Sequence, residues 1–281
     1  MTDHLQHFPD GSHSFATWTL LQEGAVPVLP CAVPFGATAC DLAPAIQSLE
    51  QNEPGMAVRF VELQLAAIPT THADHWPLSL ILGMLHVEHQ HGNSAWRVLQ
   101  TALTCRSSLK RGSVPAGNFT STVVQASLAM ATIALSVRKL TTAEQCASDA
   151  VRVIQQNPMA FGAEVLQDVR ADAMTVFAAI RLAQRRYHEA ETLLEPAHDA
   201  HRQAGDIQQC VVDLILMADV EYHSGSLLSA CSLLYDGERI LTEDFDPARH
   251  WRHRRLNLAV RQRLRRYRMA STTSISRLSW N

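Results

Sequence analysis

Small residues recur in pairs along this chain, and the two members of each pair lie twelve positions apart. Four such pairs occur, namely Gly83 and Ala95, Ala131 and Ala143, Ala178 and Ala190, and Ala218 and Ala230. Each pair lies in two apolar segments of helical period that are joined by a short polar turn. Successive pairs are 48, 47 and 40 residues apart. Because small side chains let two helices approach closely, the pattern predicts a repeated helical hairpin.

The best-formed units, between Asp172 and Leu241, resemble tetratricopeptide (TPR) repeats. That signature places a small residue midway along the first helix, a Gly at the turn and an Ala early in the second helix. The matching residues are Gly225, Leu227 and Ala230, then Leu182, Tyr187, Ala190 and Leu194, and in part Gly83, Gly92, Ala95 and Leu99. Around Ala143 the turn glycine is replaced by Arg138 and Lys139. Since these repeats exceed the ~34-residue standard, they look more like the long, divergent repeats of regulatory and scaffold proteins.

The resemblance implies an all-α fold, a right-handed superhelical array of helical hairpins of the TPR-like α-solenoid type. We expect four to five hairpins in residues 38–248, with a turn at Pro54–Gly55 and a long loop over 111–121. Residues 1–37 contain four prolines and predict an extended N-terminal arm, because proline cannot donate to a sheet ladder. Residues 249–281 predict an Arg-rich capping helix followed by a Ser/Thr tail.

The resemblance also implies a partner-binding groove lined by side chains of the first helix of each hairpin. Carried over position by position, the groove candidates are Asp172, Thr175, Val212, Ile215, Asp219, Tyr222 and His223, with Leu128, Thr132 and Ala179 as further members. The sequence therefore predicts that a partner protein or peptide is held along these positions.

The C-terminal region carries a concentrated positive charge. Residues 249–281 contain ten arginines and no acid, although the whole chain has a formal net charge of −3. The candidate basic surface consists of Arg252, Arg254, Arg255, Arg261, Arg265 and Arg266. Leu256, Val260, Leu264 and Tyr267 share one helical face, which is typical of an end cap on a repeat array. A nucleic-acid contact and docking on an acidic protein surface, including that of a second copy, stay open as alternatives.

Residue patterns for catalysis or metal binding are weak. His86, His89 and His91 lack zinc-ligand spacing, and His198 and His201 are expected to be solvated or core-edge imidazoles on a polar surface. No nucleophile motif and no Gly-rich phosphate loop occurs, so we expect no catalytic residues, no metal and no cofactor. The six cysteines form no CxxC pair and favour a reducing compartment.

The sequence thus predicts a non-enzymatic adaptor, scaffold or chaperone that binds a protein or peptide partner within a larger complex. A regulatory factor contacting nucleic acid and a domain sensing a peptide or small ligand are the alternatives. No secretory signal and no apolar run of ~20 residues is visible, so we expect a soluble, cytoplasmic protein without a membrane span, or a nuclear one in a eukaryote. Homo-oligomerisation stays open.

Overall fold

The computed structural model describes residues 41–51, 53–72, 74–88, 91–105, 116–243 and 256–269, and these ranges contain helices and turns but no strand. The expected arm over 1–37 lies outside them, as do Arg252, Arg254 and Arg255. Within the same ranges, no helix is both long enough and apolar enough to cross a membrane.

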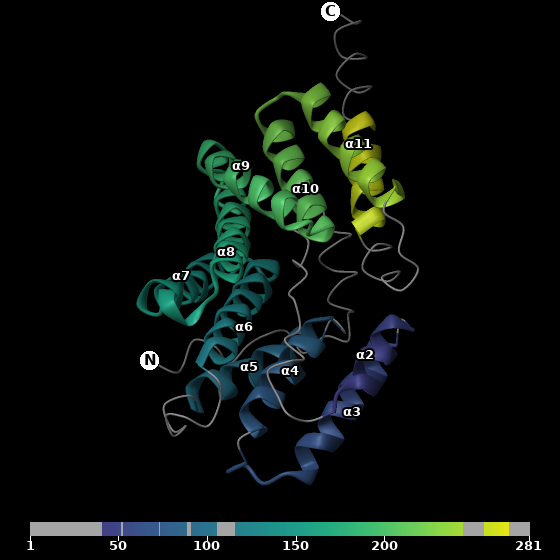
Figure 1. Cartoon of the computed structure of the whole chain (residues 1–281). Helices are drawn as coiled ribbons and strands as arrows, with labels where there is room; N and C mark the ends of the chain where they lie inside the picture. Colours follow the sequence, from purple (N-terminus) through teal and green to yellow (C-terminus); the bar gives the residue numbers. More distant parts are fainter. Residues whose placement is uncertain are drawn as a thin grey trace, which may run out of the picture.

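The helices follow one another along the chain, and most of the described connections are a few residues long. Their bounds are α2 Ala43–Glu50, α3 Pro54–Ala67, α4 His75–Glu88, α5 Gly92–Cys105, α6 Ala116–Ser136, α7 Leu140–Gln156, α8 Ala163–Ala183, α9 Tyr187–Ala204, α10 Ile207–His223 and α11 Leu227–Glu243. A 3-10 turn, Pro158–Ala160, precedes α8. The last helix of the described ranges, residues 256–269, follows α11 and is drawn in yellow in Figure 1.

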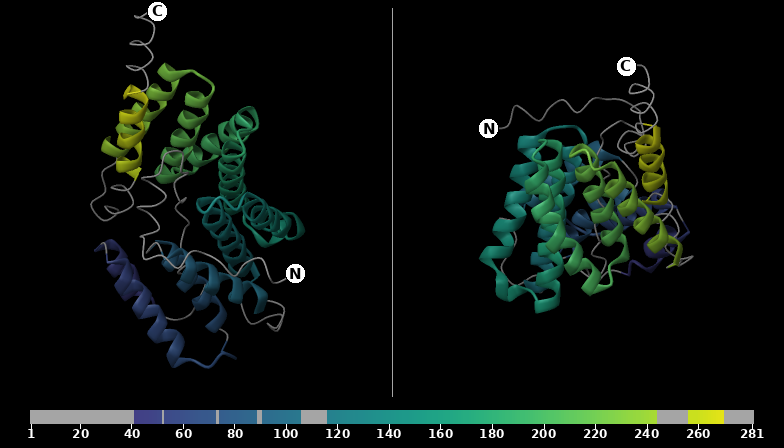
Figure 2. Two further views of the ribbon diagram at one scale, coloured as in Figure 1. Left: turned by 180° about the vertical axis from the view of Figure 1, so that it is seen from behind. Right: turned by 90° about the horizontal axis from the view of Figure 1, so that it is seen from above.

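Neighbouring helices pack in sequence order. The closest packing joins α4 to α5, α6 to α7, α8 to α9 and α10 to α11, and the first helices of successive pairs also contact one another from α4 through α10. The array bends, so that α2 and α3 at one end and α11 at the other lie on the same side of the molecule (Figures 1 and 2). This all-helical, sequence-ordered packing is consistent with an α-solenoid.

The paired small residues lie where the helices of each pair meet. Ala95, Ala131, Ala143, Ala178, Ala190, Ala218 and Ala230 are all fully buried. A Cβ atom added at Gly83 would lie 2.5 Å from Leu99 Cδ2. Hence α4 and α5 approach so closely that only glycine fits without rearrangement, which is the close approach expected from the sequence.

The turns of three consecutive hairpins share one backbone conformation. Arg138, Arg185 and Gly225 all have positive φ, at 57°, 62° and 92°. At each turn, the backbone N–H groups of this residue and of the next one donate to carbonyl groups at the end of the preceding helix. For example, Arg138 N–H donates to Leu135 O, and Lys139 N–H donates to Ala134 O. This is a Schellman motif, in which glycine is the preferred left-handed residue. Arg138 and Arg185 therefore adopt the backbone conformation of a glycine, and the type of turn is the same with or without glycine.

Replacing Arg138 with glycine is expected to stabilise the protein. The left-handed conformation is strained for a residue with a Cβ atom, and Arg138 is exposed, so little packing is lost. Glycine also gives the unfolded chain more conformational entropy, which offsets part of this gain. The net expectation is that the free energy of unfolding rises by about 0.5–1 kcal/mol. Urea unfolding measures it. The matched change Gly225→Ala should destabilise; a destabilising Arg138→Gly would contradict this explanation of the turn.

Two local expectations differ from the structure. Pro54 and Gly55 do not form the turn between the first two helices but begin α3, because the fixed φ of proline suits the first helical position. Ala116–Ser121, expected within a loop, form the first turns of α6. The α6 sequence continues to Ser136 without proline or a capping break, which explains the longer helix.

The helix of residues 256–269 closes the array against α10 and α11. Leu256, Ala259, Val260, Leu264 and Tyr267 are buried in the main hydrophobic core, which extends from α4 to this helix. Gly237 of α11 lies close to both Val211 of α10 and Val260, so the three helices meet there. A separate, smaller core joins α2, α3 and α4.

Candidate functional site

Most of the predicted groove residues on α8 and α10 face the interior. Thr175, Val212 and Ile215 are at most 1% exposed, and Leu128, Thr132 and Ala179 are buried as well. They pack against neighbouring helices of the array, so a partner does not reach them in this conformation. Asp172, Tyr222 and His223 remain at least partly exposed.

A buried polar network holds α6, α8, α9 and α10 together. His201 Nδ1 of α9 lies 2.7 Å from Asp213 Oδ2 of α10, and Thr175 Oγ1 donates to Asp213 Oδ1 at 2.7 Å. His201 Nε2 lies 3.4 Å from Asp172 Oδ1, an ion-pair distance. Gln125 Nε2 of α6 donates to Asp172 Oδ2 at 2.8 Å. Two of the predicted groove residues, Asp172 and Thr175, therefore serve this network.

The sequence context of His201 suggested a position on a polar surface, but the side chain is buried and only 2% exposed. Burial alone lowers the pKa of the imidazole, yet the hydrogen bonds and charges of Asp172 and Asp213 outweigh it and raise that pKa to about 10. The imidazolium at neutral pH thus lies between two carboxylates. A buried cation is tolerated here because each ring nitrogen faces the side chain of an aspartate.

The stability that His201 contributes should depend on pH. Because its pKa rises from 6.5 to about 10 on folding, the contribution is complete below pH 6.5 and is lost as the pH rises through 10. We expect the difference in unfolding free energy between the wild type and His201→Gln to shrink steadily from pH 6.5 to 10. Urea titrations at several pH values test it. A difference that is constant over this range would show that His201 is not charged in the folded protein.

A second buried network fastens the last helix. Arg263 is bound to the carboxylate of Asp219 through Nε at 2.9 Å and Nη2 at 2.9 Å, and Tyr267 donates its hydroxyl to the same carboxylate. Burial, with the Asp219 charge, raises the pKa of Tyr267, so the hydroxyl keeps its proton. Asp219, predicted to contact a partner, is thus occupied within the chain by two residues of the last helix.

Aromatic rings continue from this network to the surface. The rings of Tyr222 and Tyr267 stack with centroids 4.1 Å apart, and Tyr187 stacks on His223 at 5.4 Å. The Arg266 guanidinium lies 5.2 Å from the centroid of Tyr222. Burial and the positive charges of Arg266 and Arg185 lower the pKa of His223, against the opposing effect of Asp219. The exposed end of α10 is therefore aromatic and positively charged.

The candidate basic surface is largely engaged where the structure describes it. Arg261 pairs with Glu238 of α11 at 3.1 Å, and Arg266 lies over the rings of Tyr222 and Tyr267. Arg263, not assigned to that surface from sequence, is buried, whereas Arg265 is exposed. Several arginines thus attach the last helix to α10 and α11 instead of forming a free cationic surface.

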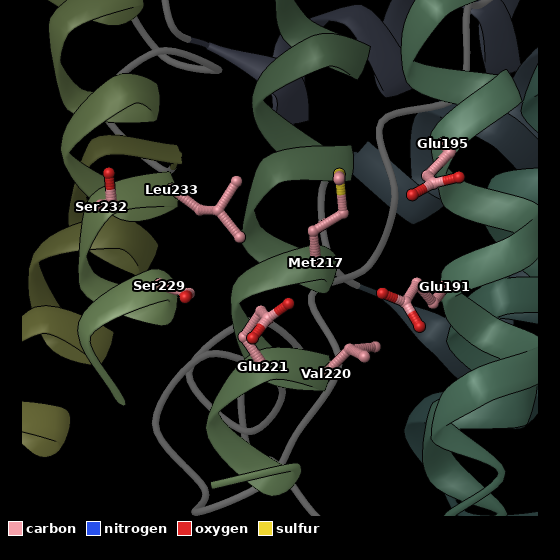
Figure 3. A pocket seen from close by; sticks show the side chains of 8 residues that line it. All are labelled: Glu191, Glu195, Met217, Val220, Glu221, Ser229, Ser232 and Leu233. Atoms are coloured by element: carbon pink, nitrogen blue, oxygen red, sulfur yellow. The ribbon is translucent and has the colours of Figure 1, made fainter. Parts of the chain in front are cut away.

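A surface pocket of about 330 Å³ lies between α9, α10 and α11 (Figure 3). Its lining residues are Glu191, Glu195, Met217, Val220, Glu221, Ser229, Ser232 and Leu233. Figure 3 shows the two α9 carboxylates and Met217 on facing helices, with Leu233 directed from α11 toward α10. The walls come from two consecutive helical pairs, so the pocket exists only because the pairs pack in this order.

The pocket is on the side of α10 opposite the predicted groove. Residues two positions apart on a helix point about 200° apart, so Met217 and Glu221 face away from Asp219. Met217 and Glu221 line the pocket, whereas Asp219 contacts the last helix. The spacing of four residues in Glu191–Glu195 and Met217–Glu221 was a readable signal that each pair shares a helix face.

The described ranges contain no group of three or more His, Cys, Asp or Glu side chains arranged to hold a metal ion. Cys146, Cys210 and Cys231 are free thiols. Burial raises the pKa of Cys146 and of Cys210 to about 11, so both stay protonated at neutral pH. They act as small apolar side chains in the helix contacts.

Comparison of the chain with protein-family models and with curated proteins finds no match.

Proposed function

We propose that this protein is a non-enzymatic, TPR-like adaptor or scaffold that binds a partner protein or peptide. In this proposal the five helical pairs form a right-handed superhelical array, and the last helix caps it. The observation that carries the proposal is the pocket between α9, α10 and α11, because it is assembled from two successive pairs. Surfaces built between repeats are characteristic of proteins that bind other chains.

The placement of the pocket revises where the partner would bind. The positions implied by the TPR resemblance are largely buried, whereas the pocket presents polar and apolar side chains together on an accessible surface. Such a mixed lining suits side chains of a partner segment, with apolar contact for affinity and polar groups for orientation. Tyr187, Tyr222 and His223 form a separate aromatic surface at the end of α10 and the start of α9.

The nucleic-acid alternative gains little support from the described part of the last helix, where Arg265 is exposed but three other arginines are engaged within the chain. Arg261, Arg263 and Arg266 are held by Glu238, by Asp219 and by the Tyr222 and Tyr267 rings. A phosphate-binding surface needs side chains that are free to neutralise phosphates. Arginines that attach the last helix to acidic residues of α10 and α11 are poorly suited to binding phosphates.

Blocking the pocket tests the adaptor proposal. Ser232 is exposed on the pocket wall, so Ser232→Trp would fill the cavity without disturbing the core. Tagged wild-type protein is isolated from cells of the source organism, and copurifying proteins are quantified by mass spectrometry. We expect Ser232→Trp to reduce recovery of the specific partner at least tenfold.

The matched control is Thr101→Trp, which adds the same side chain at an exposed position of α5. It should leave partner recovery unchanged. Both variants are checked for unaltered far-UV circular dichroism and thermal unfolding. Equal recovery with Ser232→Trp and Thr101→Trp would contradict the assignment of the pocket as the partner site.

A further inference from the structure

The pocket between α9, α10 and α11 has an unbalanced charge. Three of its eight lining residues are glutamates, and none is basic. Glu191 and Glu195 come from α9, and Glu221 comes from α10, so the carboxylates border the cavity from two helices (Figure 3). A bound group therefore meets negative charge on two of the three walls.

Some surface carboxylates elsewhere are neutralised by neighbours within the chain. Glu144 binds Arg181 at 2.8 Å, and Glu238 binds Arg261 at 3.1 Å. Within the described ranges, by contrast, the carboxylates of Glu195 and Glu221 have no hydrogen-bond or ion-pair partner, and Glu191 has only His188, 3.6 Å away. The pocket is thus a place where the chain collects negative charge without supplying the cation.

The rest of the lining is apolar or weakly polar. Met217, Val220 and Leu233 provide aliphatic surface, and Val220 is buried. Ser229 and Ser232 add hydroxyl groups on the α11 wall. A ligand that matches this lining has an aliphatic stem for contact with Met217 and Leu233 and a cationic end for the glutamates. Arginine and lysine side chains have this construction.

The cavity volume also fits a side chain with its adjoining backbone. About 330 Å³ lies at the lower end of the range for ligand pockets, too small to enclose a folded element but large enough for one long side chain. The cavity, its aliphatic lining and its unmatched charge together define the occupant.

We propose that this pocket binds the side chain of an arginine or lysine in the partner segment, with the glutamates at its cationic end and Met217 and Leu233 along its stem. This inference rests on the adaptor function proposed above and names the chemistry of the partner. The pocket therefore selects basic segments and discriminates against neutral residues of the same shape.

Two probes of nearly equal shape test the proposal on the full chain. Nα-acetyl-L-arginine amide carries one guanidinium, and Nα-acetyl-L-citrulline amide is its neutral counterpart. The methyl groups of the protein's eight methionines are labelled with 13C, and the Met217 signal is assigned with Met217→Leu. We expect the arginine probe to shift the Met217 signal saturably, and the citrulline probe to need at least a tenfold higher concentration for the same shift.

Removing the charge completes the test. In Glu195→Gln/Glu221→Gln, we expect the arginine probe to bind at least tenfold more weakly. Glu62→Gln, at an exposed position of α3, should bind as the wild type does. Equal shifts with both probes, no saturable shift at Met217, or unchanged binding in the double variant would each overturn the assignment.

The outcomes separate this proposal from the adaptor function. If Ser232→Trp abolishes partner recovery while the arginine probe gives no response at Met217, the adaptor function stands and the cationic specificity is refuted. If the arginine probe binds but Ser232→Trp leaves partner recovery unchanged, the pocket recognises cations and its assignment as the partner site is refuted.

Discussion

Replacing Arg263 with methionine is expected to lower the free energy of unfolding by about 3–5 kcal/mol, because it leaves the buried Asp219 carboxylate without its cation. Arg263 and Asp219 are both nearly inaccessible, with side chains 8% and 9% exposed. Methionine fills similar space, so lost packing contributes little. Urea unfolding followed by circular dichroism measures the effect.

Arg261→Met is the matched control on the same helix. Arg261 pairs with Glu238, but its side chain is 60% exposed, so this ion pair should contribute only about 0–1 kcal/mol. Adding Asp219→Leu to Arg263→Met should recover much of the lost stability, since an apolar pair has no uncompensated charge. Similar losses for Arg263→Met and Arg261→Met would contradict the buried ion pair.

Replacing His201 with leucine is expected to cost a similar amount, about 3–5 kcal/mol at pH 6.5. The fully buried Asp213 would keep the Thr175 hydroxyl but lose the imidazolium 2.7 Å away. An unpaired carboxylate at this depth is strongly disfavoured. Thermal and urea unfolding of the variant measure the loss, and circular dichroism shows whether the helices persist.

His188→Leu provides the comparison, since His188 lies on the same helix with its side chain 88% exposed. Its replacement should change stability by no more than about 0.5 kcal/mol. If His201→Leu is as harmless as His188→Leu, the interior of α8, α9 and α10 is not organised around a charged imidazole.

Both networks bear on the proposed partner site through the walls of the pocket. His201 connects α9 to α10, and Arg263 connects the last helix to α10. The pocket is formed by α9, α10 and α11, whose relative positions depend on these connections. Weakening either network should therefore loosen the pocket without altering its lining residues.

The hairpins were predictable because their signals are local. Ala178 and Ala190 lie on either side of the Arg185 turn at the same distances as Ala218 and Ala230 from Gly225, and all four alanines are buried. Helical periodicity and the need for small side chains at a close crossing depend on short stretches of chain. The turn at Arg138 and Lys139, which lacks a glycine, was also placed correctly, because Arg138 takes up the glycine conformation.

The candidate binding surface was less predictable because it depends on which helix covers which face. Asp213 and Asp219 interrupt an otherwise apolar helix. From sequence alone, a polar residue at such a position is equally compatible with lining a binding groove and with belonging to a buried polar network. Asp213 and Asp219 are buried because α9 packs against one side of α10 and the last helix packs against another. The signal that was missed is the presence of carboxylates within an apolar run, which predicts a buried cation partner.

The acidic pocket could not be predicted from the sequence for a similar reason. Glu191 and Glu195 look like solvated residues on α9, and Ser229 and Ser232 look like an ordinary exposed face of α11. Their grouping arises when α10 inserts Met217 and Glu221 between them. No single segment contains enough of the pocket to show it.

Site-specific photocrosslinking tests most directly whether the pocket between α9, α10 and α11 holds a partner protein. Benzoylphenylalanine is placed at Leu233, which lines the pocket, and in a second protein at Met159, which is 95% exposed elsewhere. After irradiation in cells of the source organism, we predict one protein crosslinked from position 233 and not from 159, at a segment containing arginine or lysine. This crosslink should disappear in Ser232→Trp. Identical crosslinks from both positions, or none from position 233, would contradict a partner site in the pocket.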